Sequence, residues 1–125
     1  MAQPKLTAEQ VRRIEEIGEF QRAADHLKRL VSELDSNRAG HTRTIQQLSE
    51  RIGREASEMR QRALTSNIGT IADVAGSMSV MAGRGGGIQM KIRALADAVN
   101  SLHMQLDAAL KHAKTPVPPE QKKPS

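Results

Sequence analysis

The residues best suited to metal chemistry are four histidines, because the sequence contains no cysteine. None of them follows a glutamate by three residues, the spacing that di-iron and di-manganese helical bundles use. A His-Glu-x-x-His run is also absent. We therefore predict no metal and no cofactor. His41 has an alternative role: in a continuous helix it would lie on the apolar seam near Arg38, where it could set register or respond to pH.

Acidic residues and glycines offer little evidence for catalysis. The carboxylates of residues 8–37 alternate with arginines and lysines, which is typical of a solvated helix face with pairs three or four residues apart. Asp73 is the only acid in its segment and could pair with Arg84 or with an arginine of a neighbouring helix. The glycines at 83 and 85–87 could suggest phosphate binding, but no Gly-Lys-Ser/Thr follows and no strand precedes them. We predict that the chain is not an enzyme and has no small-molecule substrate.

Nucleic-acid binding is suggested by a set of arginines that we call the basic stripe. On a helical projection they fall within about 100°, opposite an arc of aliphatic residues. The natural target of such a stripe is a phosphate backbone. With no Trp or Tyr and one Phe, the chain has little for unpaired bases to stack on, so sequence-specific single-strand binding is disfavoured. The predicted nucleic-acid contacts are the stripe and two tail lysines: Arg43, Arg51, Arg54, Arg62, Lys122 and Lys123.

The first helix that must position these residues begins near residue 8. Thr7 and Gln10 form a capping-box pattern, in which each side chain can satisfy a backbone donor at the helix start. Apolar residues then recur at heptad spacing from Ile17 to Met59, which argues for helix–helix packing. Residues 36–42 interrupt the seam with Asn and Gly, and we prefer a turn there. The unbroken register favours the alternative, one continuous helix past residue 60.

The second half of the chain predicts two further helices separated by glycines. After Met59 the apolar phase slips and resumes, which we interpret as a local change in supercoil. Small residues on 69–83 predict a helix packed on two sides. Gly83–Gly87 ends it, since consecutive glycines carry too much backbone entropy to continue a helix. We expect Met78, Met81, Met90 and Met104 to fill the core. The last helix offers a predicted interface seam: Ile88, Ile92, Leu95, Val99, Leu102 and Leu106.

Together these patterns predict an all-α helical bundle or coiled coil of about three helices, at 8–37, 42–82 and 88–112, that is oligomeric. We expect one domain over 1–112 and a disordered Pro/Lys-rich tail over 113–125. The sequence shows neither a secretory signal nor a membrane segment, which favours a soluble, cytoplasmic protein.

The leading functional hypothesis is a non-enzymatic, oligomerising interaction or scaffold module that pairs with itself or with another helical protein. The alternative is a basic accessory protein that contacts nucleic-acid phosphates without strong sequence specificity. The net charge of +5 is compatible with both hypotheses.

Overall fold

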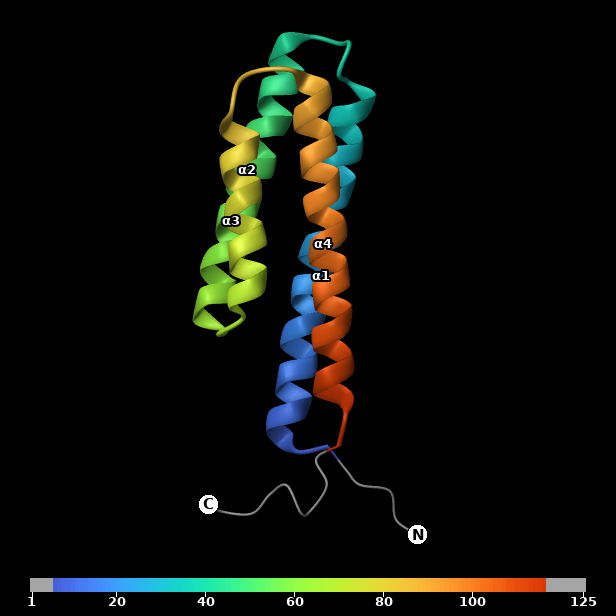
Figure 1. Cartoon of the computed structure of the whole chain (residues 1–125), viewed down its shortest axis with the longest axis vertical. Helices are drawn as coiled ribbons and strands as arrows, with labels where there is room; N and C mark the ends of the chain where they lie inside the picture. Colours follow the sequence, from blue (N-terminus) through green and yellow to red (C-terminus); the bar gives the residue numbers. More distant parts are fainter. Residues whose placement is uncertain (1–5, 117–125) are drawn as a thin grey trace.

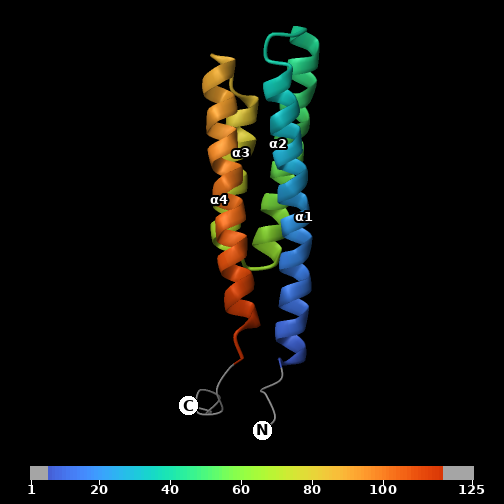
Figure 2. The ribbon, with the colours of Figure 1, turned by 90° about the vertical axis from the view of Figure 1, so that its right-hand side faces the viewer.

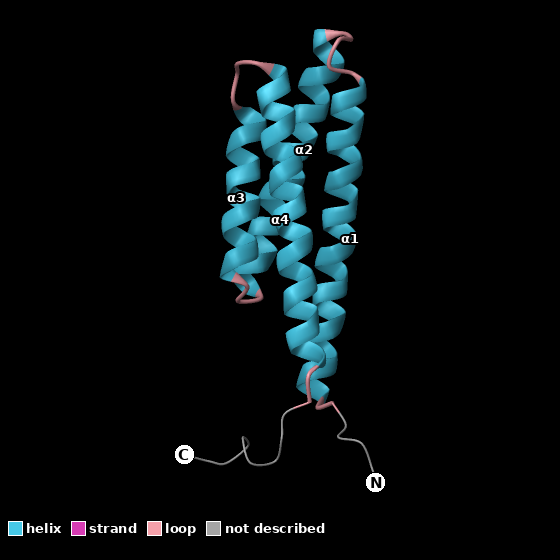
Figure 3. Ribbon diagram, turned by 45° about the vertical axis from the view of Figure 1, so that its right-hand side comes forward, coloured by secondary structure: helices cyan, strands magenta, loops and turns pink. Residues whose placement is uncertain are grey.

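The computed structural model describes residues 6–116, and within them the chain forms four helices and no strand (Figures 1 and 3). The helices are α1 (Ala8–Ser36), α2 (Thr42–Thr65), α3 (Gly69–Gly83) and α4 (Ile88–Lys114). Each packs against its neighbours in sequence, and α4 packs against α1. This is an up-down-up-down bundle. The predicted all-α bundle is confirmed, with four helices in place of about three.

The bundle is uneven in length, because α2 and α3 form a shorter hairpin than α1 and α4. The two long helices continue side by side past the turn between α2 and α3 (Figures 1 and 2). A hydrogen bond joins them in this part, where the amide of Gln10 donates to the carbonyl of Thr115 at 2.9 Å; further along the two helices, the amide of Gln21 donates to Asp107 at 3.3 Å.

The ends of α1 follow the sequence signals closely. Thr7 and Gln10 form the predicted capping box, with hydrogen bonds of 2.9 and 3.0 Å. At the other end, the Asn37 side-chain amide donates to the carbonyl of Glu33 at 2.8 Å, which gives this carbonyl a second hydrogen bond beside the one from the backbone N–H of Asn37. His41 then has extended backbone and serves as the N-cap of α2. The preferred turn is therefore confirmed and the continuous helix is wrong; the shared register belongs to two separate helices.

The predicted helix 42–82 is wrong because the chain turns between α2 and α3. Asn67 adopts the left-handed conformation with φ of 63°. The backbone N–H of Ile68 donates to the carbonyl of Ala63 at 2.8 Å, and that of Asn67 donates to the carbonyl of Leu64 at 3.2 Å. These two bonds make a Schellman motif, which ends α2, and both Ile68 and Ala63 are buried there. The slip in apolar phase marks this turn, and Leu64 beside it is half-exposed.

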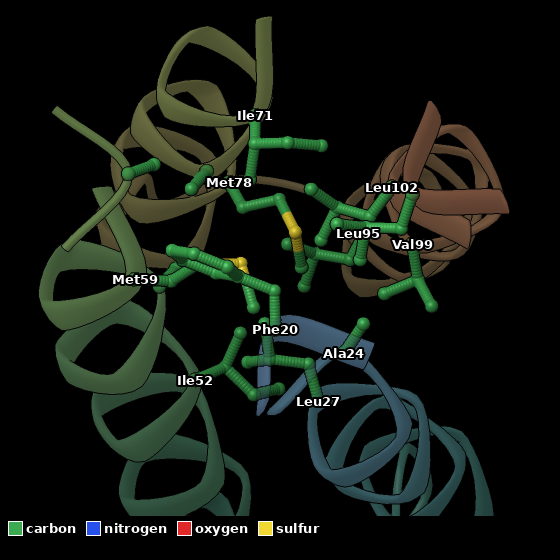
Figure 4. Packing of buried hydrophobic residues seen from close by; sticks show 14 of the residues in the cluster. Phe20, Ala24, Leu27, Ile52, Met59, Ile71, Met78, Leu95, Val99 and Leu102 are labelled. Atoms are coloured by element: carbon green, nitrogen blue, oxygen red, sulfur yellow. The ribbon is translucent and has the colours of Figure 1, made fainter. Parts of the chain in front are cut away.

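The core is built almost entirely from aliphatic side chains. Phe20, Met59 and Met78 meet in its centre, with leucines of α4 closing the far side (Figure 4). The α2–α3 contact is lined by small residues: a Cβ on Gly53 would lie 3.5 Å from the Cβ of Ala82. Since α3 also packs against α4, the predicted packing of this segment on two sides is confirmed.

The first prediction compares two neighbouring positions of α4 that differ in burial. Leu102 is fully buried, so Leu102→Ala should lower the free energy of unfolding by about 2–5 kcal/mol through lost burial and a residual cavity. Met104 is 72% exposed, so Met104→Ala should change the free energy of unfolding by less than about 0.5 kcal/mol. Urea denaturation followed by circular dichroism measures both. Equal effects at the two positions would contradict the described orientation of α4.

The second prediction concerns the turn at Asn67. Asn67→Val should lower the free energy of unfolding by about 1–2 kcal/mol, because a β-branched residue is strained in the left-handed region. Asn67→Gly should stay within about 0.5 kcal/mol of the wild type. Asn100→Val, at an exposed helical position of α4, controls for general effects of valine. A Val variant at 67 that is as stable as this control would argue against the turn.

Candidate functional site

Arg51 of the basic stripe lies at the contact between α1 and α2. Its Nε atom is 3.1 Å from Oε2 of Glu55, and its Nη2 atom is 3.4 Å from Nε2 of His26. The other Glu55 oxygen lies 3.1 Å from the same His26 nitrogen. Three polar side chains from two helices thus form one cluster on the rim of the core, and Arg51 takes part in holding the helices together.

Arg62 is engaged with α1 in the same way. Its Nη2 atom lies 3.2 Å from Oε2 of Glu19, and its guanidinium carbon lies 5.3 Å from the centroid of the Phe20 ring. A cation over an aromatic face is attracted by the ring quadrupole. Arg62 therefore closes the edge of the core above Phe20.

The other two members of the basic stripe face solvent. Arg43 and Arg54 are exposed, and neither forms an ion pair or a side-chain hydrogen bond with any residue between 6 and 116. Lys122 and Lys123 lie outside the described residues. Projection along one helix placed all four arginines together, but only two of them contact the neighbouring helix α1: Arg62 pairs with Glu19, and Arg51 contacts His26.

The predicted interface seam of α4 lies inside the bundle. Ile92, Leu95, Val99, Leu102 and Leu106 are buried against the other helices of the same chain, and Ile88 is partly buried beside them. The burial of this seam therefore requires no second copy. Any surface used for association has to lie on the outer faces of the helices.

The methionines divide between the core and the surface. Met78 is buried and Met81 is partly buried, as predicted, whereas Met90 and Met104 are 79% and 72% exposed. The core assignment is thus wrong for these last two. Their positions fall on the opposite side of α4 from its buried seam.

The titratable residues are not gathered into a metal centre in the part of the chain that the structure describes. His103 lies 3.5 Å from Asp25 across the α1–α4 contact. Asp73 is exposed, and neither Arg84 nor another described arginine pairs with it. His103 therefore lies at a contact between two helices, and Asp73 lies in solvent.

A groove that sequence reasoning missed runs between α2 and α3. We call it the α2–α3 groove; it opens to solvent, has a volume of about 570 Å³ and is lined by Arg60, Gly76, Ser77, Val80, Met81 and Arg84. Arg60 lies across Gly76, with its Cδ atom 3.1 Å from where a Cβ would stand. The stripe of small residues on α3 was the available signal, because it marks where α2 approaches.

A second open pocket of about 260 Å³ lies between the start of α1 and the end of α2. Phe20 and Arg62 line it together with Glu16, Glu19, Gln61, Thr65 and Ser66. The Arg13 guanidinium closes one end by donating to the carbonyl of Ser66 at 2.7 Å. Its charged groups are already paired, which leaves few free contacts for a ligand.

Comparison with known proteins returned no match, whether to a family model, to a curated protein or to a solved structure. Of the described helices, none has the length and apolar character needed to cross a membrane.

Proposed function

We propose that this chain is a non-enzymatic helical interaction and scaffold module that associates with itself through its outer helix faces. The observation that carries the proposal is the distribution of apolar side chains. The four helices bury their heptad seams within one chain, yet large apolar residues remain outside: Val80, Met90 and Met104 are 57%, 79% and 72% exposed.

These exposed residues lie on two adjoining helices. Val80 is in the last turn of α3 and Met90 is in the first turn of α4, so both lie near the connection between the two helices. Met104 follows Met90 by fourteen residues, which places it on nearly the same side of α4. Single exposed apolar residues are common, but three on one helix pair offer flexible, polarisable contact points for a helical partner.

The charged residues support a structural role. Arg51, Arg62 and His26 join α1 to α2, and His103 faces α1 from α4. Such contacts define which helix faces meet, whereas catalytic carboxylates or histidines are usually tuned by burial in a pocket. As part of this proposal we place the module in the cytoplasm; the sequence contains no cysteine, so the fold needs no disulfide and is compatible with a reducing compartment.

The third prediction tests self-association. Sedimentation equilibrium at micromolar concentration should show a mass above that of one chain. The double substitution Met90→Gln and Met104→Gln should weaken association by about tenfold or more, since each would remove buried apolar area from the interface. The matched control, Val11→Gln and Leu64→Gln, alters partly exposed residues on α1 and α2 and should leave association unchanged. A wild type that is monomeric throughout this range would refute the proposal.

We also propose, as the second candidate, weak binding to nucleic-acid phosphates. The observation in its favour is that Arg43 and Arg54 are exposed and make no ion pair within residues 6–116, on a chain of net charge +5. No described side chain is arranged to read base edges, so this binding would have little sequence preference.

The fourth prediction uses the salt dependence of duplex binding. Two phosphate contacts per chain give a slope of about −1.8 in log K against log salt, and each contact from Lys122 or Lys123 adds about −0.9. Arg43→Gln with Arg54→Gln should make the slope less negative by about 1.8, because two phosphate contacts are lost. Arg51→Gln with Arg62→Gln should leave it unchanged, because those arginines are paired with glutamates. Anisotropy titration at several salt concentrations measures the slope, and no binding at low salt would eliminate this candidate.

A further inference from the structure

We infer that the α2–α3 groove binds an acidic amphipathic helix of a partner protein. The groove is open along the outer side of the hairpin, and its six lining residues combine two guanidinium groups with apolar and small side chains. Within residues 6–116 its lining comes only from α2, from α3 and from the residue that caps α3, so neither α1 nor α4 contributes to it.

The charge of the groove is uncompensated within the described part of the chain. Arg60 and Arg84 are exposed, and neither forms an ion pair or side-chain hydrogen bond to a residue between 6 and 116. By contrast, Arg13, Arg51 and Arg62 all contact glutamates. Carboxylates of a ligand would therefore find two free cations able to form charge-assisted hydrogen bonds.

The apolar part of the groove follows the geometry of a helix. Ser77, Val80 and Met81 are spaced at i, i+3 and i+4, so they form one ridge along α3, and Arg84 follows it as the C-cap residue, with extended backbone. This spacing matches the way an amphipathic helix lays its apolar face into a groove. Val80 is more than half exposed and Met81 is partly buried, and methionine adapts readily to the shape of a partner.

At Gly76 the floor of the groove carries no side chain. Only the flexible Arg60 side chain covers it, so rotation of that side chain would both expose the backbone of α3 and bring the guanidinium to a ligand. Small residues allow another helix to approach closely. The ridge and the Arg84 that follows it cover residues 77–84, so they can accompany a partner helix for about 10 Å, or two turns.

A protein helix fits this groove better than nucleic acid does. Two cations beside an apolar ridge would make few phosphate contacts, and the only aromatic residue, Phe20, is buried and unavailable for base stacking. A second copy fits less well than an acidic partner, because the carboxylates of α1 are interleaved with arginines and lysines that the groove would repel.

The test is fluorescence anisotropy with the full chain and a labelled, capped peptide of about 18 residues, long enough to form an isolated helix. The peptide carries leucines on one face, glutamates beside them and alanines elsewhere; a second peptide has glutamine in place of every glutamate. We expect the acidic peptide to bind more tightly than the glutamine peptide. Arg60→Gln with Arg84→Gln should weaken its binding about fivefold, as expected for two exposed ion pairs, and Val80→Gln should also weaken it.

The matched control is Arg22→Gln with Arg29→Gln, which removes the same charge from exposed positions of α1 and should leave the affinity unchanged. Circular dichroism verifies that every variant keeps its helicity. No binding, equal binding of the two peptides, equal loss in the control variant, or displacement of the peptide by duplex DNA would each overturn the inference. Val80 belongs to both this groove and the proposed self-association surface, but the two proposals are tested apart: the arginine variants test the groove, and the methionine variants test self-association by sedimentation.

Discussion

Close packing of helices around aliphatic and small side chains is the constraint on which this structure depends. The chain has a single aromatic residue, Phe20, so large rings cannot fill wide spaces between helices. The helices must instead come near enough for alanines to be buried, as Ala56 is on α2 and Ala75 on α3. Such interiors tolerate few voids, so each turn must bring the next helix back into close contact with the previous one. The three connections between the helices, of three to five residues each, meet this requirement.

Because the interior is apolar, the polar groups that join helices are confined to its rim. The cluster of His26, Arg51 and Glu55 and the stack of Arg62 on Phe20 are partly exposed, where an ion pair contributes about 0.2–1 kcal/mol. Their main effect is on the orientation of the helices, since they favour contact between α1 and one particular face of α2. These rim contacts also distinguish arginines that are paired from arginines that are not. Those beside α1 are paired, whereas Arg54 and Arg60 remain free of such contacts within the described residues.

Signals contained within one short segment were readable from the sequence. The capping box at Thr7 and Gln10, the turn before His41 and the glycine link after Gly83 each depend on local backbone chemistry. The turn at Asn67 was missed because a single left-handed residue suffices there, and the surrounding residues are compatible with helix. The accompanying slip in apolar phase has two physical causes, a turn or a change in supercoil, and sequence spacing alone does not separate them.

The candidate surface was harder to predict because it is made by two helices. Arg60 comes from α2 and the Val80 ridge from α3, so no projection of one helix brings them together. Helix α3 also begins and ends with glycine and contains Gly76 in its interior, which costs about 1 kcal/mol of helix propensity relative to alanine. Its helical form must therefore be maintained by the burial of Ile71, Ala75 and Met78 against α2 and α4. The outer ridge of α3 contributes little to that burial, which leaves it free to carry residues suited to recognition.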